Sequence, residues 1–179
     1  MVPQYELSAR WVCRRLGIEI VDIGEFVCCG MNQVNLDIEG GHLLAAMNLA
    51  LAEAEGLDIV TLCAACYGML SETARELKDE RRRAETNKRL SVIGLEYSGA
   101  VEVKHLSRVI YEDLGTERIR GEIRRDLSGL RVASHYGCHY LKPRHDLDGL
   151  DDPENPRTLD ELISATGAES IGYETLLHC

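Results

Sequence analysis

The sequence has no apolar run that approaches membrane-spanning length, and it is short of positive charge. A transmembrane helix needs about 20 apolar residues in a row, and no run in the 179 residues comes near that. The first residues also lack the charged-then-apolar layout of a secretion signal, so we expect a cytoplasmic protein. A formal net charge of -10 argues against binding to nucleic-acid phosphates and favours proteins or small molecules as partners.

Cysteine, in contrast, is plentiful and unevenly spaced. The seven cysteines include two tight pairs, Cys28-Cys29 followed by Gly30, and Cys63-Ala-Ala-Cys66. In a reducing compartment, an odd number of cysteines is better explained by ligands and redox thiols than by a framework of disulfides. Thiols in such pairs are soft ligands, which suit an iron-sulfur cluster or zinc.

Apolar patterning predicts alternating helices and strands, and each of three cysteine sites follows a predicted strand. These strands are residues 18–23 before Cys28, residues 57–62 before Cys63, and residues 130–134 before Cys138. In open parallel sheets, ligands bind outside the carboxyl ends of the strands. We therefore predict an α/β fold with a Rossmann-like lobe, a parallel sheet and a shared cofactor site at the sheet edge.

The rest of the chain is predicted to be mostly helical. A helix should run from Cys66 through Leu77 and on into residues 78–89, whose mixed charges suit a solvated face. A short extended segment is expected at residues 101–105, followed by a helix that ends at Gly115.

An internal repeat relates residues 16–28 to residues 166–179, with a one-residue offset and a cysteine at the end of each. The repeat implies two similar lobes, which we place at residues 1–125 and 126–179. The second copy opens with a strand and Cys138, but the first has no room for the matching strand and cysteine. We therefore expect both ends of the natural chain to be missing.

Five segments carry a resemblance to a known family: residues 2–10, 16–19, 26–30, 63–67 and 135–140. On these segments the chain resembles the cysteine-rich CCG family, and within it the B subunits of heterodisulfide reductase, over essentially its whole length. The resemblance implies lobes that carry Gly-Cys, then Cys-Cys-Gly, then Cys-x-x-Cys. It also implies two non-cubane 4Fe-4S clusters in the full-length protein.

Carried onto this chain, the resemblance implies two sets of cluster ligands. They are Cys28, Cys29, Cys63 and Cys66 in the first lobe, and Cys138 and Cys179 in the second. The opening cysteine of the first lobe is absent, and Cys13 does not replace it. Cys13 is predicted to lie within a helix, where a packed thiol is the ordinary interpretation.

The implied activity is the reduction of a disulfide, the heterodisulfide of coenzyme M and coenzyme B. The implied partners are a flavin-bearing A-like subunit and a ferredoxin-like C subunit. His139 follows Cys138 directly and is our candidate for the acid that protonates the departing thiol. A structural histidine explains that position equally well.

Three other interpretations remain open at the level of sequence. A CCG subunit of a lactate, glycolate or succinate-type dehydrogenase complex would have the same ligands and another substrate. A non-catalytic scaffold could hold zinc with all four paired cysteines. Thiol exchange at Cys63 and Cys66, as in thioredoxin-like proteins, would leave Cys28 and Cys29 unexplained.

Overall fold

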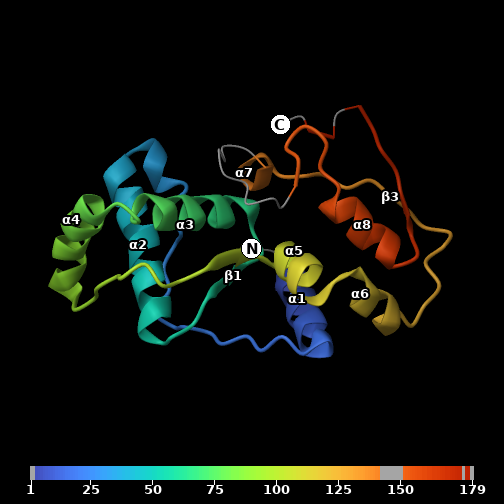
Figure 1. Ribbon diagram of the computed structural model, residues 1–179, viewed down its shortest axis with the longest axis horizontal. Helices are drawn as coiled ribbons and strands as arrows, with labels where there is room; N and C mark the ends of the chain where they lie inside the picture. The colour runs from blue at the N-terminus through green and yellow to red at the C-terminus, as the bar shows by residue number, and fades with distance from the viewer. Residues whose placement is uncertain (1–2, 142–150, 175, 178–179) are drawn as a thin grey trace. The chain divides into compact units, whose positions relative to one another are not determined.

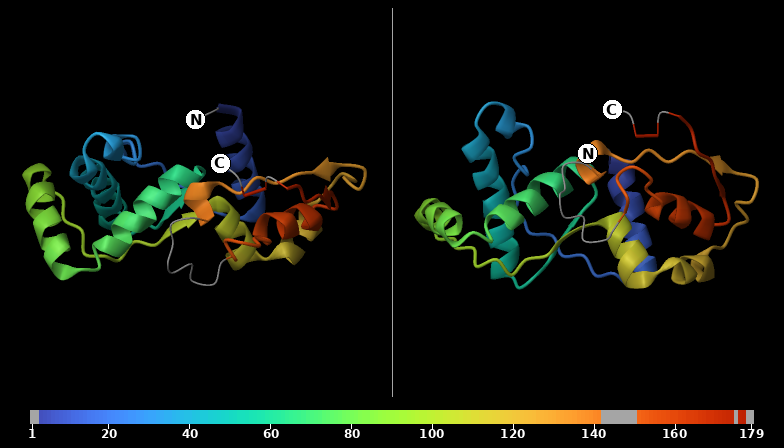
Figure 2. Two further views of the ribbon diagram at one scale, coloured as in Figure 1. Left: turned by 90° about the horizontal axis from the view of Figure 1, so that it is seen from above. Right: turned by 45° about the horizontal axis from the view of Figure 1, so that its top comes forward.

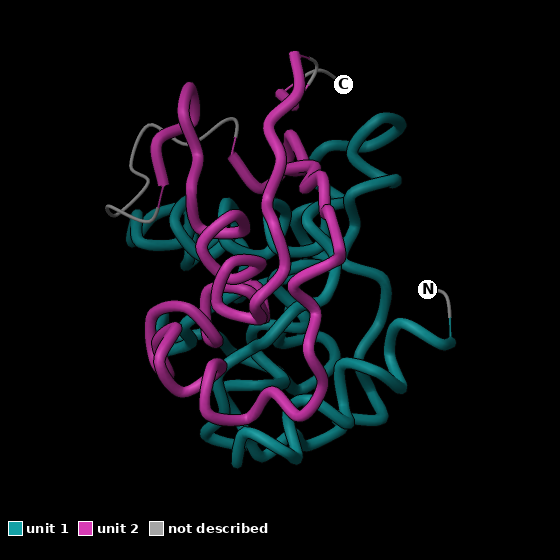
Figure 3. The backbone as a smooth tube through the Cα atoms, turned by 90° about the vertical axis from the view of Figure 1, so that its right-hand side faces the viewer, with its two compact units in different colours: residues 1–104 teal, residues 105–179 magenta. Residues whose placement is uncertain are grey.

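Helices make up most of the described chain, and its strands are two or three residues long. The computed structural model describes residues 3–141, 151–174 and 176–177 (Figure 1). The chain divides into two units, Met1–Lys104 and His105–Cys179 (Figure 3). The predicted α/β class is confirmed, whereas a Rossmann-like lobe stays a prediction because each sheet in the described part of the chain has only two strands. Within the described ranges, no helix is both long enough and apolar enough to span a membrane.

The first unit is built around its longer helices, with β1 and β2 side by side. Its elements are α1 (Pro3–Leu16), η1 (Gln33–Asn35), α2 (Ile38–Ala54), β1 (Ile59–Thr61), α3 (Ala64–Glu76), α4 (Glu80–Leu90), η2 (Ser91–Ile93) and β2 (Val103–His105), of which β2 ends at the first residue of the second unit.

The second unit has shorter helices and one parallel pair of strands. Its elements are α5 (Leu106–Arg108), the π-helical η3 (Val109–Leu114), α6 (Thr116–Glu122), β3 (Arg131–Val132), α7 (Cys138–Leu141), α8 (Thr158–Ala165) and β4 (Glu169–Ser170). Strands β3 and β4 are parallel, with Val132 opposite Ser170.

Helix α2 forms the core of the first unit. Asp37 caps its N-terminus by accepting the N–H of Gly40 at 2.9 Å, which satisfies one of the unpaired N–H groups of the first turn. Ala45, Ala46 and Leu49 in its middle are 0% exposed. Small side chains let neighbouring helices approach closely, and α2 packs against α3, as the views in Figure 2 also show.

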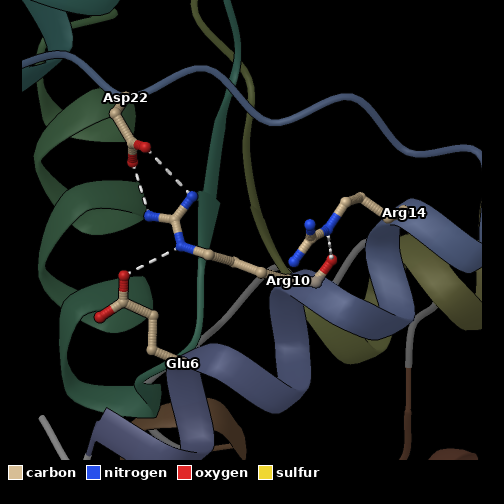
Figure 4. A network of polar contacts seen from close by, with 4 residues as sticks. All are labelled: Glu6, Arg10, Arg14 and Asp22. Atoms are coloured by element: carbon tan, nitrogen blue, oxygen red, sulfur yellow. Dashed lines mark hydrogen bonds and ion pairs between the residues drawn. The ribbon is translucent and has the colours of Figure 1, made fainter.

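The predicted strand at residues 18–23 is wrong. The segment is irregular, whereas its counterpart in the repeat forms β4 against β3. A strand needs a hydrogen-bonded neighbour, and no described strand lies beside residues 18–23. The segment is held instead by α1, because Arg10 donates to both carboxylate oxygens of Asp22, at 2.6 and 3.1 Å, and to Glu6 at 3.0 Å (Figure 4).

The other predicted elements are largely confirmed, with two corrections. The helix expected from Cys66 into residues 78–89 is two helices, because Asp79 accepts the N–H of Arg82 at 2.9 Å and so caps a new helix. The helix that ends at Gly115 ends there as predicted, but it is π-helical from Val109 onward.

The loop at residues 98–100 is anchored to α2 by one carboxylate. Glu53 accepts the N–H groups of Ser98, Gly99 and Ala100 at 2.6, 3.0 and 2.7 Å. Burial acts to raise the pKa of Glu53, but these hydrogen bonds outweigh it and leave the pKa below its ordinary value. The ionised form of Glu53 is therefore favoured over the protonated form more strongly in the folded chain than in the unfolded chain.

We expect Glu53→Gln to lower the free energy of unfolding by about 1 kcal/mol near neutral pH, because an amide is a weaker acceptor than a partly solvated carboxylate. The folded pKa lies below the unfolded one. The stabilisation of the fold by ionised Glu53 is therefore fully present above the unfolded pKa of about 4.3, and it is lost as the pH falls through the folded pKa. Urea unfolding at neutral and acidic pH measures both effects. Glu55→Gln is the control, because Glu55 is exposed and follows α2 directly. It should change neither the stability at neutral pH nor the loss of stability at acidic pH.

Candidate functional site

Two segments of the first unit carry the paired cysteines. Cys28 and Cys29 lie in the irregular loop that precedes η1. Cys63 is the N-terminal cap residue of α3, and Cys66 lies in the first turn of that helix. Strand β1 ends at Thr61, so the Cys63 pair follows a strand as predicted.

The structure places the two pairs close enough for their thiols to affect one another's ionisation. Cys29 interacts with Cys66 and with Cys28, and Cys66 interacts with Cys63. Cys28 is exposed, and the other three are half-buried. The two pairs, separated in sequence by the whole of α2, are therefore linked through Cys29 and Cys66.

The pKa values of Cys29 and Cys66 are shifted in opposite directions. The hydrogen bond from Cys66 lowers the pKa of Cys29 to about 6, with further help from the N–H of Met31 and the thiol of Cys28, against the effect of burial. The pKa of Cys66 is raised by the same hydrogen bond, by burial, and by electrostatic interaction with Cys29 and Cys63. Because a thiolate is the form that binds metals, Cys29 is prepared to act as a ligand near neutral pH.

The cysteine loop lies directly against α2 at Gly30. Gly30 has a φ of +89°, and a Cβ atom there would lie 2.1 Å from the carbonyl oxygen of Gly41. Any side chain at this position would be strained and would also clash with backbone. The glycine after the cysteine pair is therefore required by the close approach of the loop to the helix.

The second unit holds Cys138 and His139 at the start of α7. Cys138 is half-buried and His139 is exposed. The segment before them is anchored on α8, because Ser134 and Tyr136 donate to the carboxylate of Asp160 at 3.0 and 3.2 Å. The hydroxyl of Ser170, in β4, donates to the same carboxylate at 2.5 Å.

Two predicted site positions need separate comment. Cys179 lies outside the described residues. Cys13, which we did not expect to be a ligand, is 1% exposed within α1. Burial raises the pKa of the Cys13 thiol, so it behaves as a packed apolar group, as predicted.

The paired cysteines fit an iron-sulfur group by the chemistry of their donors. They offer four sulfur atoms, one of them ionised near neutral pH, and soft thiolates are the usual ligands of such clusters. The hydroxyl of Thr61, two residues before Cys63, is buried with no hydrogen-bond partner among the described residues. In the same part of the chain, no three or more His, Cys, Asp or Glu side chains are grouped to hold a single metal ion.

Sequence reasoning missed two residues that position these segments, Asn48 and Asp160. Asn48, on α2, accepts the N–H of Val27 at 2.9 Å and donates to its carbonyl at 3.1 Å. The available signal was a single asparagine within the otherwise apolar residues 43–52. Asp160 lies in the first turn of α8, where acidic residues are common because they interact favourably with the helix dipole. Nothing in the sequence therefore indicated that Asp160 also binds the segment before Cys138.

We expect Cys66→Ala to raise the pKa of Cys29 in the metal-free protein toward its ordinary value of about 8.5, because the hydrogen-bond donor is lost. Alkylation of Cys29 by iodoacetamide near neutral pH should then slow about tenfold, since less thiolate is present. Mass spectrometry of the Cys29 peptide over a range of pH measures the shift. Cys66→Ser keeps a donor and should retain most of the lowered pKa, so equal behaviour of the two variants would contradict this origin of the shift.

Comparison with known proteins identifies relatives over most of the chain. The family model described as "Cysteine-rich domain", abbreviated CCG, matches residues 1–71 and 132–179. The chain is 38% identical to a protein of Archaeoglobus profundus named as like the B subunit of heterodisulfide reductase, over 99% of this chain and 60% of that protein. It is also 38% identical to the B subunit of the ferredoxin/F(420)H(2)-dependent CoB-CoM heterodisulfide reductase of Methanosarcina acetivorans, over 99% of this chain and 59% of that protein.

A third relative carries a different name. The chain is 34% identical to the membrane anchor subunit of the 8-methylmenaquinol:fumarate reductase of Wolinella succinogenes, over 92% of this chain and 57% of that protein. Thus the chain spans less than two thirds of the length of each of these curated relatives.

Among solved structures, a hypothetical protein from Helicobacter pylori has a similar fold. The TM-score is 0.74 at 15% sequence identity, over 99% of this chain and 31% of that protein. At this identity the likeness concerns the fold alone. The family model covers more than half of the chain and includes both cysteine pairs, and the chain therefore belongs to the cysteine-rich CCG domain family.

Proposed function

We propose that this chain is part of an iron-sulfur oxidoreductase subunit that reduces a disulfide, with the heterodisulfide of coenzyme M and coenzyme B as its substrate. The observation that carries the proposal is that the two cysteine pairs of the first unit lie close enough to interact, Cys29 with Cys66 and Cys28, and Cys66 with Cys63. The names of the Archaeoglobus and Methanosarcina relatives support this choice of reaction and substrate.

In this proposal the four paired cysteines hold a non-cubane 4Fe-4S cluster, and Cys138 and Cys179 contribute to a second one. Vicinal thiols fit poorly around a single tetrahedral ion but can reach different metal atoms of a cluster. Gly30, which has no side chain, lets the loop that carries Cys28 and Cys29 lie against α2. When bound, the cluster supplies the electrons that cleave the disulfide.

The chain must also supply protons. Reduction of a disulfide to two thiols takes up two electrons and two protons, so each departing sulfur needs a proton source. His139 is exposed at the start of α7, next to Cys138, and a histidine can donate a proton near neutral pH. We assign it the role of protonating the departing thiol.

Electrons must reach the cluster from other proteins. We propose a flavin-bearing A-like subunit and a ferredoxin-like C subunit as partners, because the Archaeoglobus and Methanosarcina relatives are named as one subunit of a larger reductase. The formal net charge of -10 is that of a protein that binds proteins rather than nucleic acid.

We expect Cys28→Ser, Cys29→Ser, Cys63→Ser and Cys66→Ser each to lower the iron and acid-labile sulfide bound by the natural protein after anaerobic reconstitution. Removal of one thiolate should reduce the content at this site by about half or more, because a hydroxyl is a poor ligand for iron-sulfur clusters. Chemical assay of iron and sulfide measures the loss. Cys13→Ala is the matched control and should leave both unchanged. Full cluster content in all four serine variants would rule out these ligands.

We expect His139→Gln to lower the turnover of heterodisulfide about a hundredfold at unchanged cluster content, the lower end of the usual contribution of an acid catalyst. Glutamine keeps the size and hydrogen bonding of the side chain but cannot donate a proton at neutral pH. Steady-state assay of the complex, alongside iron analysis, separates the two effects. An unchanged rate would leave the histidine with a structural role only.

A second candidate function has one observation in its favour. The Wolinella relative is named as a subunit of a fumarate reductase, so a CCG subunit of a succinate-type complex is the alternative. Purification of the natural complex decides between the two, because only one of them reduces heterodisulfide and the other reduces fumarate. A colourless protein that contains zinc and no sulfide would instead indicate a non-catalytic zinc scaffold.

A further inference from the structure

We propose that Asn48 is a positioning residue that sets the separation between the two cysteine pairs, a role that rests on the proposed function of those pairs as cluster ligands. The side chain of Asn48 contacts the backbone just before the Cys28-Cys29 pair. Its Oδ1 accepts the N–H of Val27 at 2.9 Å, and its Nδ2 donates to the carbonyl oxygens of Val27 and Cys28 at 3.1 and 3.5 Å.

These contacts are made in the interior of the first unit. Asn48 is 3% exposed, and its neighbour Leu49 is 0% exposed. A buried amide without partners is costly, whereas one that is fully hydrogen-bonded specifies a single arrangement of the groups around it. Asn48 bonds to both backbone groups of Val27, as a neighbouring strand would. The loop therefore has one favourable position on α2.

The same loop is held at its other end by the same helix. Gly30, directly after the cysteine pair, lies against the backbone of Gly41. Gly41 and Asn48 are seven residues apart on α2, which places them on one face about 10 Å from each other along the axis. The cysteine pair lies between these two attachment points.

Helix α2 also supports the other pair. It packs against α3, and His42 on α2 hydrogen-bonds to Thr73 on α3 at 2.9 Å. Helix α3 carries Cys66 in its first turn. Both cysteine pairs are thus attached to one rigid helix. The relative position of Cys29 and Cys66 depends on how firmly the loop is attached at Asn48.

The chain contains a natural control for this interaction. Asn87, on α4, makes the same two contacts with Tyr97, accepting its N–H and donating to its carbonyl, each at 3.0 Å. Asn87 belongs to a different loop that carries no cysteine. Substitution of Asn87 removes the same chemistry from the fold without touching the cysteine loop.

The test uses the natural protein in metal-free form, equilibrated anaerobically in a glutathione redox buffer. Cys66 can then form a disulfide with either Cys29 or Cys63, and mass spectrometry gives the ratio of the two products. The Cys63 product is local and does not depend on the loop. We expect Asn48→Ala to lower the ratio of the Cys29–Cys66 to the Cys63–Cys66 disulfide about tenfold, the effect of one lost hydrogen bond of ordinary net strength.

Asn87→Ala should leave this ratio within about twofold of the wild-type value, since sites that share no partners couple weakly. An equal fall in both variants would overturn the proposal, because the effect would then reflect general loosening of the fold. An unchanged ratio in Asn48→Ala would also overturn it.

If Asn48→Ala does not fold, the pair Asn48→Asp and Asn87→Asp replaces it. Aspartate keeps the acceptor for the backbone N–H but turns a carboxylate oxygen toward the carbonyl, so the ratio should fall only for position 48. This experiment contains no metal. If the proposed function is wrong, the wild-type protein will bind no iron in the reconstitution experiment. If the Asn48 proposal is wrong, the disulfide ratio will be the same in Asn48→Ala and in the wild type. The two failures are therefore distinguishable.

Discussion

The close packing of the cysteine loop on α2 is the constraint on which the rest of the site depends. Gly30 and Gly41 meet backbone to backbone, with no room for a Cβ atom at Gly30. Ala45, Ala46 and Leu49 in the middle of the same helix are buried, and the helix packs against α3. Because protein interiors are close-packed and deform little, one helix can hold two distant pairs of thiols at a fixed separation.

That separation has an electrostatic consequence. When Cys29 and Cys66 are close enough to share a hydrogen bond, one of them is stabilised as a thiolate and the other retains its proton. A thiolate is the form that binds metals, so Cys29 is the thiol of this site that is best prepared to hold a metal group. The close approach of Cys29 and Cys66 therefore determines both the position of these thiols and the ionisation of Cys29.

The two units attach their cysteine segments to helices by comparable means. In the first unit the buried amide of Asn48 holds the backbone of Val27. In the second, the carboxylate of Asp160 accepts hydrogen bonds from Ser134 and Tyr136, just before Cys138. Each is a polar side chain on a helix that follows the cysteine segment in sequence.

The spacing of the cysteines, the α/β class and the strand that leads to Cys63 were determined by the sequence, because they depend on residues that are neighbours along the chain. The tertiary structure alone decided that residues 18–23 form no strand, since a strand exists only beside a partner. It also decided the hydrogen bonds between Asn48 and Val27 and between Asp160 and Ser134, which join residues 21 and 26 positions apart in sequence. Local patterns encode which residue types are present and how often they recur, but contacts between distant segments depend on packing, which no local pattern records.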